Sequence, residues 1–291
     1  MRILIVLFFL AGTACYAQDD LLNELEQSNP TEPEYVTSTF KGSRLVNGQT
    51  VKTKNKRELE FIFSHRFGAI NQGLYELFGL DQAYVRLGLE YGITDRLGVG
   101  LGRNSVDKTM DSYLRYKALK QVVGGMPVTI TAYGNFAIKT SPKKEDAGFD
   151  ITLEDRLSYT GQLLIARKFT SALSLQLMPT VVHKNLADQT IENNTQFALG
   201  AGGRVKVSKS ISLNVEYYHR FGVPDNNPYY DALGFAVDIE TGGHDFQLII
   251  TNTRGLTERA FITETAGDFF DGDIHLGFNV TRTFQFGRKK K

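Results

Sequence analysis

Residues 87–102 read LGLEYGITDRLGVGLG, and this stretch decides the expected fold. In its first half, leucine and tyrosine alternate with glycine and glutamate. After the short ITDR segment, leucine and valine alternate with glycine. A period of two is the pattern of a β-strand with one apolar face and one small or polar face. Two such strands joined by a tight turn predict an antiparallel hairpin whose apolar face meets either a protein core or lipid.

The same pattern recurs from Glu58 almost to the C-terminus and predicts an all-β chain without long helices. Turn residues separate the alternating segments, as expected for consecutive antiparallel strands. We expect twelve strands, at residues 58–67, 83–93, 96–103, 111–120, 127–138, 156–168, 172–183, 195–207, 210–221, 232–240, 245–253 and 273–286.

The connections between these segments distinguish a soluble β-sandwich from a membrane barrel, which periodicity alone does not. Long connections, such as 68–82, 139–155 and 254–272, alternate with short turns, such as TDR and SKS. Outer-membrane barrels have short periplasmic turns, long external loops and an even strand number. We therefore expect an antiparallel up-and-down transmembrane β-barrel in the cell outer membrane, with apolar side chains toward lipid. Its expected interfacial aromatic residues are Phe67, Tyr91, Phe221, Phe246 and Phe286.

The N-terminus resembles a secretory signal. Arg2 precedes an apolar run, and Cys15 and Ala17 are the small residues that a signal peptidase reads, which predicts a signal peptide at residues 1–17. The alternative is a lipoprotein signal that acylates Cys15. Cleavage after Ala17 removes Arg2 and brings the net charge of +1 to zero. The mature chain then lacks the net positive charge that is typical of nucleic-acid-binding proteins.

The next segment, residues 18–56, is polar and has no sustained period. Its stretch STFKGSRLVNGQTVKTKNK is too polar to be expected as a core strand. We expect a leader that either stays in the periplasm or plugs the barrel. The barrel itself is expected at residues 57–287, followed by a basic tail at 288–291.

Several stretches of the first half resemble a known family. They are FKGSRLVNGQTVKT, ELEFIFSHRFG, YELFGLDQAYVRLGLEYGITDRLGVGLGR and YLRYKALKQ. They are similar to the opening half of an uncharacterised β-barrel family of Bacteroidetes-type Gram-negative bacteria, catalogued as domain of unknown function 5777. The resemblance is clearest over residues 38–120 and implies an outer-membrane barrel. Because it implies no activity, it transfers no functional residue.

The strand face opposite the apolar one carries charges of both signs, and two interpretations remain open. These charges either line a path for a small solute or pair with one another to brace a narrow barrel, because buried charges must be paired. The candidate lumen-lining residues are Arg86, Glu90, Arg115, Lys117, Arg204, Glu216 and Arg220.

The pattern as a whole predicts a channel or transporter for a small solute, in contact with outer-membrane lipid. The alternative is a non-conducting structural or partner-docking barrel whose external loops, especially 139–155 and 254–272, carry the function. We expect no enzyme, because no catalytic motif accompanies the histidines, and neither a cofactor nor a metal. In the loop 68–82, the sequence GLYELFGLDQ predicts a short helix packed on the barrel rim.

Overall fold

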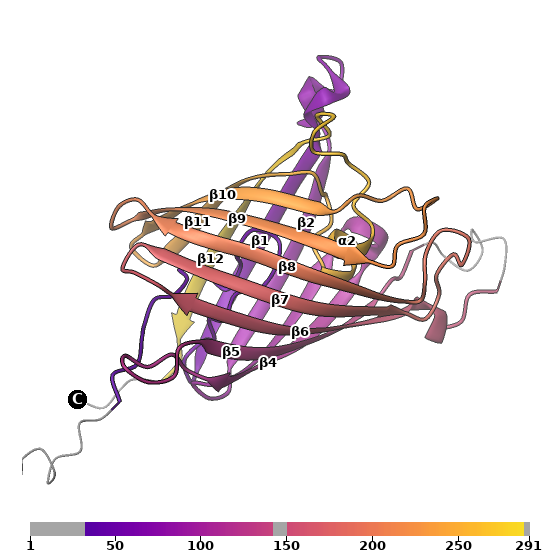
Figure 1. The fold of residues 1–291 in the computed structure, drawn as a ribbon. Helices are drawn as coiled ribbons and strands as arrows, with labels where there is room; N and C mark the ends of the chain where they lie inside the picture. Colours follow the sequence, from indigo (N-terminus) through magenta and orange to yellow (C-terminus); the bar gives the residue numbers. More distant parts are fainter. Residues whose placement is uncertain (1–32, 142–149, 288–291) are drawn as a thin grey trace, which may run out of the picture. The chain divides into compact units, whose positions relative to one another are not determined.

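The chain forms a closed ring of antiparallel strands, seen in a computed structural model that describes residues 33–141 and 150–287 (Figure 1). The barrel and the chain from Val36 onward belong to one compact unit. The expected signal peptide with Cys15, part of the loop 139–155 and the basic tail lie outside the described residues. Within the described residues, no helix is long and apolar enough to cross a membrane.

All twelve expected strands are present, and their bounds differ from the expected ones by two residues at most. Each strand pairs with its neighbours along the chain, and the last strand closes the ring by pairing with the first. The strands are β1 (Glu58–Ala69), β2 (Ala83–Gly92), β3 (Leu97–Asn104), β4 (Met110–Leu119), β5 (Thr129–Ile138), β6 (Leu157–Lys168), β7 (Leu173–Lys184), β8 (Thr195–Lys206), β9 (Ile211–Phe221), β10 (Ala232–Thr241), β11 (His244–Thr251) and β12 (His275–Gln285).

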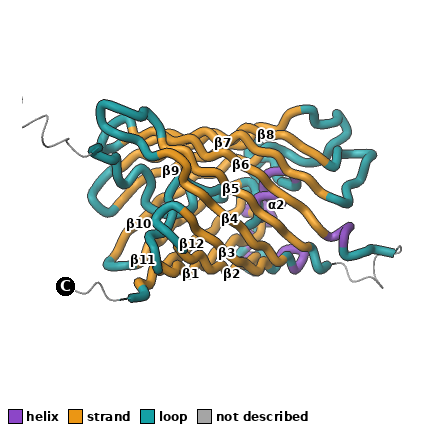
Figure 2. Tube along the Cα trace, turned by 90° about the horizontal axis from the view of Figure 1, so that it is seen from below, coloured by secondary structure: helices purple, strands orange, loops and turns teal. Residues whose placement is uncertain are grey.

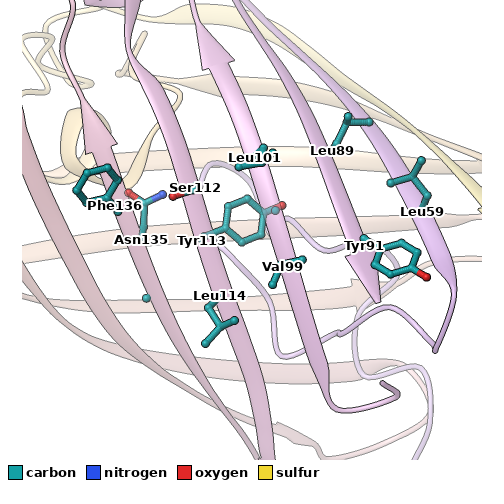
Figure 3. Close-up of a pocket in the computed structure, with 12 residues that line it drawn as sticks. Leu59, Leu89, Tyr91, Val99, Leu101, Ser112, Tyr113, Leu114, Asn135 and Phe136 are labelled. Carbon is teal, nitrogen blue, oxygen red and sulfur yellow. The ribbon is translucent and has the colours of Figure 1, made fainter. Parts of the chain in front are cut away.

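The two faces of the strands separate as the alternation predicts. On the β2–β3 hairpin, Leu89 lies opposite Leu101 and both point outward, and Leu101 is 64% exposed. The neighbouring Glu90 points inward and is fully buried. Figure 3 shows Leu101, Val99 and Leu114 beside a shallow apolar hollow of about 670 Å³ on the outer surface. An outward apolar band is the surface that a membrane barrel presents to lipid.

The connections fall into two sets at opposite ends of the barrel. The turns at 93–96, 169–172, 207–210 and 242–243 lie at the end where β1 begins and β12 ends, which we call the short-turn end. The opposite, long-loop end carries the connections 70–82, 139–156, 185–194, 222–231 and 252–274. The expected strict alternation of lengths is wrong at one place. The β4–β5 connection at 120–128 is longer than the β3–β4 connection at 105–109, because β5 starts later than predicted.

The few helical segments belong to the long-loop end, where Figure 2 shows them in purple. They are η1 (Ile70–Gln72), η2 (Leu77–Gly79), η3 (Val106–Lys108), η5 (Glu154–Arg156) and α2 (Glu258–Thr263). The expectation of a helix packed on the barrel rim in the loop 68–82 is wrong. This loop forms the two short 3-10 turns η1 and η2, and its apolar residues Leu74 and Tyr75 are exposed rather than packed.

Candidate functional site: the filled lumen

The interior of the barrel is occupied by the chain's own N-terminal segment. Residues 39–54, which we call the inner leader, lie inside the ring of strands, where Figure 1 shows them in indigo. Leu45 and Val46 are fully buried, although the stretch looked too polar for a core. It forms no strand and has only one isolated bridge, between Arg44 and Gln49. A segment without regular structure can still be buried when the surrounding wall satisfies its backbone groups.

Glu216 on β9 holds the tip of the inner leader. Its carboxylate accepts hydrogen bonds from three consecutive backbone N–H groups, those of Val46 at 3.3 Å, Asn47 at 3.1 Å and Gly48 at 3.0 Å. The tip is a tight turn, in which the Leu45 N–H donates to the Gly48 carbonyl at 2.9 Å. A carboxylate that accepts several N–H groups forms strong, charge-assisted hydrogen bonds. This expected lumen residue therefore anchors the leader.

Arg115 on β4 joins the wall to the same segment. Its Nε lies 3.2 Å from Glu90 Oε1 on β2, its Nη1 donates to the Lys52 carbonyl at 2.7 Å, and its Nη2 donates to the Gln49 side chain. The Tyr113 hydroxyl donates to Glu90 at 3.1 Å. Two of the expected lumen charges thus form a buried ion pair, and that pair also holds the leader.

Arg86 braces the wall and does not reach the leader. Its Nε and Nη2 donate to the two carboxylate oxygens of Asp111 on β4, at 2.9 and 2.5 Å. A two-point contact of this kind fits the planar guanidinium to a carboxylate. Asp111 was not among the expected lumen residues, although it alternates in phase with Tyr113 and Arg115 on β4 and faces inward with them.

The remaining three candidates lie near the two ends of the barrel. Arg204 on β8 donates to the Ser38 carbonyl at 3.1 Å, just before the inner leader begins. Arg220 on β9 lies 3.5 Å from Asp231 and donates to Asn227 at 3.3 Å, so it secures the loop 222–231. Lys117 on β4 is partly buried near the short-turn end. The seven candidates therefore do not line one continuous open path.

A second segment fills the lumen from the long-loop end. The loop 254–272 was expected to be external. This expectation is wrong for α2, because all six of its residues are buried. Figure 2 shows α2 among the strands. The Phe261 ring packs edge-on against Tyr218 of β9, with centroids 5.3 Å apart. A helix of six residues gives little periodic signal, which explains why the sequence pattern did not reveal it.

The inner leader and α2 meet inside the barrel. Glu258 at the start of α2 accepts a hydrogen bond from Gln49 Nε2 at 2.7 Å, and its Oε1 lies 3.1 Å from Arg44 Nη1. All three side chains are buried. Because a buried charge without a partner is costly, each segment stabilises the other in its inserted position.

The C-terminal end of α2 is fixed by a cluster of charges. Arg259 pairs with Glu264 and lies 3.3 Å from Asp107, and Lys184 lies 3.5 Å from Glu264. Burial alone would raise the pKa of Glu264. The attraction of Arg259, Lys139 and Lys184 outweighs burial and lowers this pKa to about 2. The inserted loop is therefore held in part by an ionised carboxylate.

The described residues contain no group of three or more His, Cys, Asp or Glu side chains that could hold a metal ion. The acidic residues of the loop 252–274 hydrogen-bond within the protein instead. The Asp268 N–H donates to Asp273 at 3.0 Å, and Asn71 donates to the other oxygen of Asp273 at 2.6 Å. The charged groups described here therefore pair with one another and hold the inserted segments in place.

A known protein family matches this barrel. The profile of one protein family, described as a membrane bound beta barrel domain (DUF5777), matches residues 40–284. No curated protein matches the chain. Among solved structures, the chain is similar to the KdgM porin, with a TM-score of 0.45 and 9% identity over 79% of this chain and 99% of that one. It is also similar to an outer membrane channel from Pseudomonas putida F1, with a TM-score of 0.45 and 12% identity over 84% and 100% of the two chains. Because the family profile covers residues 40–284, which is most of the chain, the chain belongs to the family of membrane-bound β-barrel domains.

Proposed function

We propose that this protein is an outer-membrane channel for small solutes, which its own leader and α2 close in the state seen here. One observation carries the proposal. The inner leader is attached to the wall through many polar contacts, such as those of Glu216 and Arg115, beside an apolar cluster that includes Phe40, Leu45 and Val51. The wall it would leave behind carries many polar and charged side chains, such as Glu90, Arg115 and Glu216, and a polar interior is typical of a water-filled barrel.

The strands do not need the leader for closure. The ring closes through backbone pairing between β1 and β12, and the leader adds no strand to it. A segment that lies within a closed ring and is held by hydrogen bonds can leave without opening the barrel. Water can then replace the lost hydrogen bonds and ion pairs, whereas exposure of the apolar Leu45, Val46 and Val51 opposes release.

The proposal extends to the ends of the chain. Residues 1–17 act as the export signal, and the short-turn end faces the periplasm, as in other outer-membrane barrels. Residues 18–56 form the plug-bearing leader, 57–287 the barrel and 288–291 a basic tail. The protein is then a conduit without enzymatic activity, and its ligand is a small solute.

The alternative is a non-conducting barrel whose external surface carries the function. The filled lumen favours this alternative, because α2 and the inner leader brace each other through Glu258. The exposed Tyr75 and Phe78 of the loop 70–82 offer a surface for a partner.

Single-channel recording in planar bilayers separates the two. We would compare the full chain, a variant lacking residues 18–54, and a variant that also replaces 254–267 with a short glycine-serine linker. Heat-modifiable migration on a detergent gel would show that each barrel is folded. We expect a silent full chain and steady current after removal of one or both segments. Silence from the folded double variant would contradict the channel and support the non-conducting barrel.

A further inference from the structure

A basic cavity lies at the short-turn end of the barrel, where the inner leader leaves the lumen. It has a volume of about 1150 Å³, and its charged lining residues are Lys56, Arg57, Lys117, Lys120, Glu58 and Asp95. These residues come from the leader exit, the start of β1, the turn 93–96 and the end of β4. The cavity is large enough for a small molecule and joins segments that are far apart in the sequence.

The two acids of this cavity are already engaged by uncharged donors. The Glu58 carboxylate accepts from the backbone N–H and the side-chain amide of Asn55, both at 2.8 Å. Asp95 Oδ1 accepts from the Lys56 backbone N–H at 2.9 Å. These hydrogen bonds fix both carboxylates at the exit of the leader, and the four cations of the lining outnumber the two acids.

Four cations, Lys56, Arg57, Lys117 and Lys120, line this one cavity. Among the described residues, no ion pair joins Lys56, Arg57 or Lys117 to a carboxylate. The strongest Coulomb partners of Lys117 are Lys120, Arg115, Lys52 and Arg96, which are all cations. Cations that gather around one cavity repel one another, and a bound anion relieves that repulsion.

We propose that this cavity binds a small polyvalent anion, held by Lys117 of the wall, Lys56 of the leader exit and Arg57 between them. An ammonium group offers three donors and a guanidinium offers a planar fork, and both suit phosphate or carboxylate oxygens. A polyvalent anion is favoured over a monovalent one because several cations must be neutralised at once. The site is a property of the folded barrel and does not depend on conduction.

Isothermal titration calorimetry of the purified full chain in a neutral detergent tests the site. The probes are pyrophosphate and citrate, with a neutral disaccharide as the control ligand. We expect saturable one-to-one binding of at least one anion, weakened by added salt because the contacts are ionic. The tighter of the two probes identifies the preferred group, phosphate or carboxylate.

Matched variants locate the binding. Lys117→Met and Lys56→Met should each weaken binding about tenfold, which is the loss expected for one charge-assisted contact. The control is Lys209→Met, which removes the same charge from the turn 207–210 at the same end but outside the cavity. Two results would overturn the proposal. One is the absence of saturable binding of either anion to the full chain, and the other is equal weakening by Lys209→Met.

Discussion

Replacement of Glu216 with glutamine should release the inner leader. Glu216 is 1% exposed and its carboxylate accepts from the backbone N–H groups of Val46, Asn47 and Gly48. Glutamine has the same shape but only one acceptor oxygen, and its amide group turns a donor toward other donors. The substitution therefore weakens all three contacts without leaving a large cavity.

The magnitude follows from the number of contacts. A hydrogen bond to a charged group contributes roughly 1.5–3 kcal/mol, so three of them set an upper bound of roughly 9 kcal/mol. Glutamine keeps one acceptor, and water reaches the freed N–H groups once the leader moves. We therefore expect a net loss of about 3 kcal/mol, which corresponds to about a 150-fold shift toward the released leader.

Limited proteolysis with trypsin measures this shift. The inner leader contains Arg44, Lys52 and Lys54, which are protected while they lie inside the barrel. When opening and closing are fast compared with cleavage, the cleavage rate follows the population of the released state. We expect cleavage of Glu216→Gln to be faster by about two orders of magnitude, with the barrel itself intact on a detergent gel.

Ser212→Ala is the matched control. Ser212 lies on the same strand and is fully buried, and its hydroxyl has no hydrogen-bond partner in the described part of the chain. Its removal should leave the cleavage rate unchanged. The reasoning is refuted if Glu216→Gln is cleaved at the wild-type rate, or if Ser212→Ala accelerates cleavage equally.

Three further predictions concern the leader exit, the lipid face and the inserted loop. Gly92→Ala should displace the leader exit, because the new Cβ would lie 2.0 Å from the Asn55 carbonyl oxygen. Overpacking costs about 1–3 kcal/mol and should appear as faster trypsin cleavage of the leader, whereas an unchanged cleavage rate would argue against tight packing at Gly92. Leu101→Arg, near the middle of β3, should lower the free energy of urea unfolding in lipid vesicles by about 2–4 kcal/mol, whereas Leu74→Arg in the exposed loop should not change it. Equal effects of the two substitutions would contradict the assigned lipid face. The charged form of Glu264 stabilises the fold by about 3 kcal/mol above its ordinary pKa of 4.5, and this contribution should be lost as the pH falls from 4.5 toward the folded pKa of about 2. Urea unfolding of Glu264→Gln should lack that part of the pH dependence. Identical pH dependence of the unfolding free energy in the variant and the wild type would exclude the effect.

Local pattern alone was sufficient for the barrel wall. The alternation in residues 87–102 predicted both strands and their two faces, and the pattern of long and short connections predicted that the apolar face points outward. The structure confirms that Leu101 points outward and Glu90 inward. This succeeds because strand geometry has a period of two, and because a membrane leaves a closed barrel as the available way to pair every strand. The boundary that changed the pattern of connection lengths, at 120–128, lies where turn residues and β-formers are mixed.

The contents of the lumen required the tertiary structure. The sequence narrowed the candidate charges to the correct face, but it did not pair Glu90 with Arg115, connect Arg86 to Asp111 or bring Glu216 to the leader tip. Glu216 and Asn47 are 169 positions apart in the chain. No local period encodes a contact at that distance, and neither the irregular inner leader nor the six-residue α2 has a repeating pattern of its own. The strands follow from short-range chemistry, whereas the plug depends on which distant groups the closed ring brings within hydrogen-bonding distance.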